Sequence, residues 1–350
     1  MTFAARYAEA IGAHRLRERR RWRVVSIFFL MVVVSLVLDI ATGPSLLSPA
    51  EVVRSLTGLG ERAAMTDSIV RGLRLPMALM ALAVGAALGA GGAQMQTLLN
   101  NPMASPYTLG MAAAAGFGAA LVLALGGLGL DAMIAVPLGA FVFSMLAALF
   151  LYLLASMRQM SAETIILGGI ALLFLFQSLL SLIQFLSSPE LSQQILFWFF
   201  GSLTKATWPT LALTAFVTAL CCALLMADCW KLTALRMGEM RATSLGINVR
   251  RLRMKVLVIV AVMTATATSF VGVIGFVGLV APHIARMTVG EDQRFFLPMS
   301  VLSGALMLSA ASILSKSIIP GALFPVGIVT AIVGVPFLLW LIFSPKRRGR

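Results

Sequence analysis

Long apolar stretches separated by short polar breaks run through most of the chain. A helix that crosses a bilayer needs about 20 apolar residues, and ten stretches approach this length. We therefore predict an all-α polytopic membrane protein. The predicted spans are 24–41, 76–99, 107–125, 133–154, 164–186, 209–227, 256–273, 276–288, 296–315 and 324–343. The eighth is expected to be short and irregular because glycines recur every three residues just before it and at its start.

The breaks between these stretches carry structural information of their own. Residues 48–51 (Ser-Pro-Ala-Glu) should open a short amphipathic helix, because proline is tolerated in a first turn. Residues 100–106 hold two asparagines and two prolines, which predict non-helical backbone buried in protein or lining a cavity. Glycines and alanines at four-residue spacing in 76–99 predict close helix packing. The aromatic segment 195–208 resembles an interfacial belt.

Composition supports the membrane assignment, and charge placement gives it an orientation. Hydrophobic residues make up 60% of the chain, charged residues 11%, and the mean hydropathy is +0.98. The net charge of +14 could indicate nucleic acid in a soluble protein, but most basic residues fall on one side of the predicted spans. By the positive-inside rule that side is cytoplasmic. We therefore expect membrane lipid around the chain and no nucleic-acid partner. The expected location is a bacterial inner membrane, with both termini in the cytoplasm.

The domain organisation follows from the same pattern. Residues 1–23 form a basic cytoplasmic N-terminus, residues 24–345 a single transmembrane domain, and residues 346–350 a basic cytoplasmic tail. A long polar loop, 228–255, interrupts the spans and carries seven Lys and Arg residues. We predict two short helices broken at Gly246, since glycine permits the positive φ of a helix stop. Our hypothesis is that a soluble partner acts on this loop; the alternative is an inert basic loop.

The sequence lacks the motifs of several kinds of catalysis and metal binding. No GxxxxGK[ST] phosphate loop is present, and no zinc-ligand spacing, HExxH sequence or catalytic pair is visible. We predict no catalytic residue and no metal site, with His283 as a structural cap near a helix end. Two other classes stay open. A self-powered carrier or channel is disfavoured because ionisable residues are nearly absent mid-span, and an intramembrane enzyme would need His283 paired with a serine.

Six blocks carry a resemblance to a known family. The chain resembles the FecCD-type permeases, the membrane subunits of ABC importers for iron–siderophores, haem and cobalamin. The matching blocks are RLPMALMALAVGAALGAGGAQMQTLLNNPMASPYTLG (74–110), LGGIAL (167–172), GSL (201–203), LRMGEMRATSLGINVRR (235–251), GVIGFVGLVAPHIAR (272–286) and PVGIVTAIVGVPFLLWL (325–341).

This resemblance implies a type II ABC importer architecture and a set of partners. In that family two permeases of ten helices each, identical or paralogous, pair around a central path above two cytoplasmic ATPases. ATP and Mg²⁺ are then used by the ATPases, and this chain binds no cofactor. A periplasmic binding protein delivers the cargo. We expect a ferric siderophore as the cargo, with haem and then cobalamin as alternatives.

The resemblance also implies roles for particular residues. The ATPase-coupling residues are Gly238, Glu239, Arg241, Ala242, Leu245 and Gly246. The cytoplasmic gate is Asn101, Pro102 and Met103, where the family has Asn-Pro-Leu. Docking of the binding protein is assigned to Arg74, with Arg71 compensating and Lys316 standing where arginine is usual. The chain departs from the family pattern at Met77 and Leu323, which replace a second arginine and a glutamate.

Polarity within the spans suggests residues along the path. Gln94, Met95, Gln177 and Ser178 are candidates because they are polar or flexible side chains inside otherwise apolar helices. The path is expected to be mostly apolar and lined by small residues, which suits a bulky cargo that is weakly held.

Overall fold

The computed structural model describes residues 3–43, 47–58, 64–157, 162–318 and 323–343, and the predicted tail 346–350 lies outside them. Within these ranges the chain is helices and turns, with no strand. Seven helical stretches are long and apolar enough to cross a membrane, and three shorter apolar helices accompany them. Together these seven and three match the ten predicted spans, so the all-α class is confirmed.

The helices follow one another along the chain from α1 to α15. They are α1 (Phe3–Ala41), α2 (Pro49–Thr57), α3 (Ala64–Asp67), a π-helical stretch (Ser68–Arg74), α4 (Leu75–Leu98), α5 (Met111–Ala124), a 3₁₀ turn (Gly126–Gly129), α6 (Ala132–Ser156), α7 (Ala162–Leu186), α8 (Pro189–Phe199), α9 (Trp208–Ala227), α10 (Cys229–Arg236), α11 (Glu239–Ser244), α12 (Val249–Val271), α13 (Val277–Val289), α14 (Gln293–Ser317) and α15 (Val326–Phe343).

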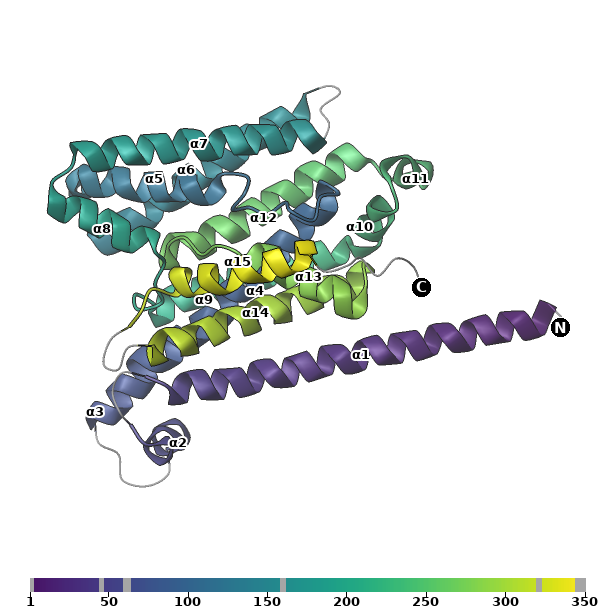
Figure 1. The fold of residues 1–350 in the computed structure, drawn as a ribbon, viewed down its shortest axis with the longest axis horizontal. Coiled ribbons are helices and arrows are strands. Elements are labelled where there is room, and N and C mark those ends of the chain that lie inside the picture. The colour runs from purple at the N-terminus through teal and green to yellow at the C-terminus, as the bar shows by residue number, and fades with distance from the viewer. Residues whose placement is uncertain (1–2, 44–46, 59–63, 158–161, 319–322, 344–350) are drawn as a thin grey trace.

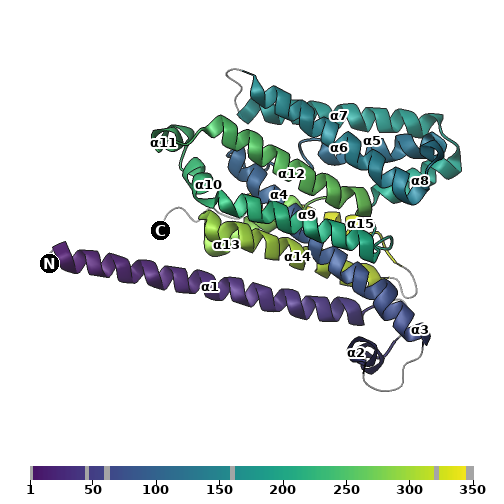
Figure 2. The ribbon, with the colours of Figure 1, turned by 180° about the vertical axis from the view of Figure 1, so that it is seen from behind.

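Helix α4 lies at the centre of the bundle. It packs against α9, α12, α13 and α14, while α5, α6, α7 and α8 form a second group beside α12 (Figures 1 and 2). Helix α1 lies along α14 and extends beyond the bundle (Figure 1). Helix α4 therefore contacts helices from both halves of the chain.

Glycines allow the neighbours of α4 to approach its backbone. A Cβ added at Gly85 would overlap the carbonyl oxygen of Gly304 on α14, and one added at Gly92 would overlap the carbonyl oxygen of Gly278 on α13. Small residues permit such contacts between membrane helices, whose association relies on close packing. The packing predicted from the small residues of this span is confirmed.

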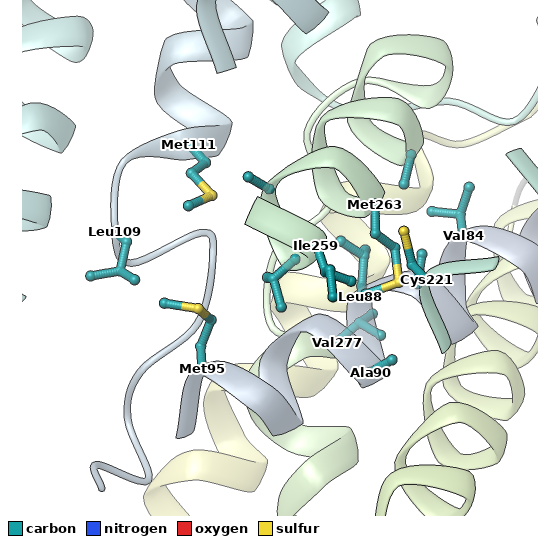
Figure 3. Packing of buried hydrophobic residues seen from close by; sticks show 14 of the residues in the cluster. Val84, Leu88, Ala90, Met95, Leu109, Met111, Cys221, Ile259, Met263 and Val277 are labelled. Atoms are coloured by element: carbon teal, nitrogen blue, oxygen red, sulfur yellow. The ribbon is translucent and has the colours of Figure 1, made fainter. Parts of the chain in front are cut away.

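Buried side chains fill the space between α4 and its neighbours. Figure 3 shows Met95 on α4 facing the segment that carries Leu109 and Met111, while Met263 of α12 packs beside Leu88. All five belong to one buried apolar cluster. Met95, predicted to line the path, is fully buried in this core.

The two ends of the bundle differ in what they carry. The start of α1 lies at the same end as α10 and α11, whereas α2, α3 and α8 lie at the other end (Figures 1 and 2). We call the first the basic end, because α10, α11 and the start of α12 hold the basic residues of 228–255. We call the second the opposite end.

Four details add to or differ from the predictions. The basic segment predicted before the first span is continuous with that span in one helix, α1, from Phe3. The segment assigned to an aromatic belt, 195–208, overlaps the end of α8 (Pro189–Phe199), whose N-cap is Ser188. His283 caps no helix: it lies within α13, and its ring packs edge-on against Phe337. The third predicted span, 107–125, corresponds to α5, which starts at Met111 because the preceding turn ends at Gly110 with φ 81°.

Candidate functional site

The polar loop 228–255 folds into a compact helical unit at the basic end. Helices α10 and α11 are separated at Gly238 (φ 116°), and Gly246 (φ 78°) separates α11 from α12. Glycine adopts these positive φ values without the steric penalty of a side chain. The predicted pair of short helices is present, but the break between them is at Gly238. The last residues of the predicted loop, 249–255, form the first turns of α12.

Helix α11 is fixed to the bundle on one side and exposed on the other. Ala242 is fully buried, and Glu239 forms a 3.0 Å ion pair with Arg253 of α12. Met240 and Leu245 are 87% and 59% exposed. Apolar side chains exposed beside a strongly basic segment are typical of a contact surface for a partner protein.

The predicted coupling residues divide along these lines. Gly238 is half-buried, Arg241, Leu245 and Gly246 are exposed, and Ala242 is an anchor instead of a contact. Met240, the most exposed large apolar side chain of the unit, was not predicted. Its apolar character inside a polar loop is the signal that could have identified it.

The predicted gate lies in the non-helical segment that follows α4. Asn100 adopts a left-handed conformation (φ 44°), and the Asn101 Oδ1 accepts a 2.8 Å hydrogen bond from the Met103 N–H. Pro102 and Met103 are exposed. The segment then turns through Ser105 before α5 begins. Prolines and an Asn-centred turn explain why the helix stops here.

A network of side chains joins this segment to the end of α10 and to the turn between α13 and α14. The Arg236 Nη1 donates to the Asn100 Oδ1 at 2.5 Å, and its Nη2 lies 2.7 Å from the Glu291 Oε1 in the turn between α13 and α14. Arg286 lies 3.0 Å from the same Glu291 oxygen and donates to the Gln96 Oε1 at 2.9 Å. The hydrogen bond from Arg236, then the charges of Arg236 and Arg286, hold the pKa of Glu291 below its usual range despite partial burial.

A cavity opens beside this network. It has a volume of about 380 Å³ and lies between α1, α10 and the α13–α14 turn. Its lining residues are Arg17, Arg21, Thr233, Arg236, Met237, Glu291 and Asp292. Arg21 lies 3.6 Å from Asp292 and above the ring of Phe295. The charged side chains of the network, Arg236 and Glu291, therefore border an open cavity at the basic end.

The predicted path residues are not brought together by the structure. Gln94 is buried and donates at 3.0 Å to the Gln293 Oε1 of α14, and Met95 lies in the core. Gln177 is half-buried and Ser178 exposed, both on α7. Gln293 also donates to the Thr97 Oγ1 at 2.9 Å. Within this single chain Gln94 and Gln293 are therefore packing elements between α4 and α14.

The predicted docking residues lie at the opposite end, where two of them are buried. Lys316 forms a 2.7 Å ion pair with Asp39 of α1, and the two side chains are 3% and 0% exposed. Ser312 donates to the same Asp39 oxygen at 2.8 Å. Arg74 is buried and donates to the carbonyl oxygens of Ile40 and Ala41 at 3.2 and 3.0 Å. These side chains hold the end of α1 against α4 and α14.

Arg71 is placed differently. It is exposed, and its Nε donates at 2.8 Å to the carbonyl oxygen of Ser55 in α2. The indole N–H of Trp208 donates to the Arg71 carbonyl oxygen at 3.2 Å. Of the three predicted docking residues, Arg71 is the one with a side chain at the surface. Among the described residues no group of three His, Cys, Asp or Glu side chains could hold a metal ion.

Comparisons with known proteins agree with this architecture. The model of the FecCD transport family matches residues 30–344. The hemin transport system permease protein HmuU of Yersinia pestis is 32% identical over 279 residues, which cover 79% of this chain and 83% of that protein. The Fe(3+)-citrate import system permease protein YfmE of Bacillus subtilis is 31% identical over 336 residues, covering 95% and 98%.

A solved structure shares the fold over almost the whole chain. It is an inward-facing ABC transporter assigned to the metal-chelate type, with a TM-score of 0.81 and 27% identity, covering 92% of this chain and 99% of that one. The helical bundle and these similarities thus define a polytopic membrane permease of the ABC importer class. The chain belongs to the FecCD transport family.

Proposed function

We propose that the chain is the transmembrane permease of an ATP-driven importer that carries a ferric siderophore from the periplasm to the cytoplasm. Two permease chains pair around the path, and two cytoplasmic ATPases bind at the basic end. A periplasmic binding protein docks at the opposite end. The orientation that we propose has both termini in the cytoplasm of a bacterium and the spans in its inner membrane. The basic segments support it, since such segments stay on the cytoplasmic side.

The observation that carries the proposal is the geometry of α11. Its exposed Met240 and Leu245 offer an apolar contact, while buried Ala242 and the Glu239–Arg253 ion pair fix the helix to α12. A short helix held in this way transmits displacement to the spans, whereas a mobile loop would absorb it. ATP binding to the paired ATPases draws the two α11 units together, and hydrolysis resets them.

Docking at the opposite end is proposed to use Arg71. Its side chain is exposed while its Nε and Nη2 donate to carbonyl oxygens of Ser55 and Leu56 in α2. We propose that it meets an acidic residue of the binding protein there. Arg74 and Lys316 support it from behind by fixing the ends of α1 and α14. Charge pairs at such a surface steer the encounter and set its register more than they add affinity.

The cargo assignment rests on the relatives. The similarity to the Fe(3+)-citrate permease of Bacillus subtilis supports an iron chelate. The similarity to the hemin permease of Yersinia pestis makes haem the second candidate, and cobalamin is the third. The predicted gate residues Asn101, Pro102 and Met103 carry no charge, which is compatible with any of these bulky ligands.

The test uses the permease with its co-expressed ATPase and binding protein in proteoliposomes. We expect uptake of a radiolabelled ferric siderophore that requires ATP, with hemin and cobalamin assayed in parallel. Met240→Glu should reduce co-purification of the ATPase, whereas Arg251→Gln, an equal change in net charge on the exposed first turn of α12, should not. Uptake by the permease alone, without any ATPase, would instead show a self-powered carrier or channel.

A further inference from the structure

We infer that Arg236 is a positioning residue that transmits movement of the coupling unit to the gate segment. This inference rests on the proposed function. It assigns to one side chain the connection between the part of the chain that meets the ATPase and the part that closes the path. The coupling unit is α10 and α11, and the gate segment is 99–110, the non-helical stretch between α4 and α5.

The contacts of Arg236 join three segments that are far apart in the sequence. Arg236 is the last residue of α10, two positions before Gly238. One terminal nitrogen donates to the Asn100 Oδ1 at 2.5 Å and the other to the Glu291 Oε1 at 2.7 Å. These partners lie 136 and 55 positions away along the chain. A displacement of α10 therefore acts directly on both the gate segment and the α13–α14 turn.

The chemistry of the connection requires arginine. The guanidinium group is a rigid planar fork with five N–H donors, so it can hold two acceptors in fixed directions at once. A lysine ammonium is a compact point charge on a flexible stem and does not fix such a geometry. Hydrogen bonds from a charged donor are also about twice as strong as neutral ones.

The network closes on itself through α4. Arg286 of α13 lies 3.0 Å from the Glu291 oxygen that Arg236 binds, and it donates to the Gln96 Oε1 of α4 at 2.9 Å. Gln96 stands four residues before Asn100. The ends of α10, α13 and α4 are thus linked in a ring, and the gate segment leaves from one corner of it.

A second connection lies one turn earlier on α10. The Thr233 Oγ1 accepts a 3.1 Å hydrogen bond from the backbone N–H of Gln293, the first residue of α14. Gln293 in turn donates to the Thr97 Oγ1 of α4 at 2.9 Å. Thr233 and Arg236 are three residues apart and share one face of α10. The whole of this face is therefore tied to the end of α4 that leads into the gate.

The backbone at Asn100 is suited to a change of state. Its φ of 44° lies in the left-handed region, which asparagine tolerates better than most residues. The conformation is less favourable than a helical one, so contacts to the Asn100 side chain bias the choice between them. The Arg236 hydrogen bond supplies such a contact, and its loss frees the gate segment from the position of α10.

The experiment measures ATP hydrolysis and uptake in the assembled complex, with whichever of ferric siderophore, hemin or cobalamin the wild type imports. Arg236→Gln is expected to keep ATPase binding and hydrolysis while lowering cargo imported per ATP about tenfold, equivalent to about 1.4 kcal/mol. Arg236→Lys should recover only part of this ratio. The matched control is Lys231→Gln, which removes one positive charge from the same helix. The Lys231 side chain pairs with Asp228 at the start of α10 and not with Asn100 or Glu291.

A double-mutant cycle identifies the connection. If Arg236 acts through Asn100, Asn100→Gly should lower the ratio by itself, because glycine keeps the positive φ without the side chain that Arg236 binds. The double variant should then be no worse than Arg236→Gln alone. An unchanged ratio in Arg236→Gln, or effects that add in the double variant, overturns the inference. If Arg236→Gln fails to assemble, Asn100→Gly decides: a lowered ratio supports the inference and an unchanged ratio overturns it. Absence of ATP-dependent uptake by the wild type overturns the proposed function, and with it this inference.

Discussion

The two ends of the bundle each contain a basic side chain that binds a carboxylate and joins distant helices, but the two pairs differ in burial. At the opposite end, Lys316 and Asp39 are 3% and 0% exposed. At the basic end, Arg236 and Glu291 are 18% and 41% exposed, beside an open cavity. The distances are the same, 2.7 Å in both pairs.

The difference in burial implies a difference in use. A buried charge whose partner is removed is left without solvation, so the buried pair cannot exchange partners at a small cost. A pair that water can reach loses little when it opens, because water replaces the lost contact. We therefore expect the Lys316–Asp39 pair to fix α1 to α14 in every state, and the Arg236–Glu291 pair to rearrange during transport.

The largest expected effect is on stability at the opposite end. Lys316→Met should destabilise the protein by about 3–5 kcal/mol, because it leaves the Asp39 carboxylate buried without its cation. Replacing both partners, with Lys316→Met and Asp39→Leu together, should recover most of that loss, since well-packed apolar residues often match a buried ion pair. Thermal unfolding in detergent measures both. A single variant as stable as wild type would contradict the proposed fixation of α1.

A smaller effect on stability is expected for the matching change at the basic end. Arg236→Gln should cost about 1 kcal/mol, because its bonds are partly solvated and glutamine can keep one of them. This cost leaves the protein folded, because native stability is typically about 5–15 kcal/mol. The expected loss in cargo imported per ATP would therefore reflect the lost contact with Asn100 and not unfolding. A loss of stability as large as that of Lys316→Met would remove the distinction between a fixed end and a rearranging end.

The sequence was sufficient for features that depend on local pattern. Hydropathy located the seven helices that are long enough to cross a membrane and the three shorter apolar helices, because lipid-facing segments are mostly apolar and must satisfy their own backbone hydrogen bonds. The short helices of the loop 228–255 could be predicted because Gly246 and the basic residues are local signals. Proline at 49 after Ser48 likewise marked α2, in which Ser48 and Glu51 form a capping box.

Features that depend on which helices meet could not be predicted from this one sequence. Asp39 and Lys316 are separated by 277 positions, and nothing local indicates that α1 and α14 pack together. Lys316 was assigned to docking because it stands where the resembling family has an arginine, and that resemblance gave no sign of its ion pair with Asp39. Arg236 was missed for the same reason, since Asn100 and Glu291 become its neighbours only after α4, α10 and α13 are packed.

Two helical segments were not predicted because hydropathy detects only apolar helices. The basic residues before Val24 are compatible with a helix, and α1 includes them, but they produce no apolar stretch. Helix α8 is short, and its aromatic residues suggested a belt at the membrane surface. In both cases helix formation follows from local propensity and capping, not from lipid contact.

A pH series sharpens the comparison further, with an effect below about 1 kcal/mol because Glu291 is partly exposed. The hydrogen bond from Arg236 lowers the pKa of Glu291, so its contribution to stability is present above the unfolded pKa of about 4.3 and is lost as pH falls through the lower folded value. The stability difference between wild type and Glu291→Gln should therefore be constant from pH 8 to pH 6. A difference that fades in this range would mean that another group controls the network.

The smallest expected effect is on docking. Arg71→Glu should slow association with the binding protein a few-fold at low salt, and the effect should shrink as ionic strength rises, since exposed charges are screened beyond about 10 Å at 0.1 M salt. Arg54→Glu, the same charge change on exposed α2, is the control and should leave the rate closer to wild type. Association rates at several salt concentrations test this. Equal effects of the two variants would show that only the overall charge of the opposite end matters, whereas a salt-dependent loss specific to Arg71 locates the encounter beside the buried residues that fix α1.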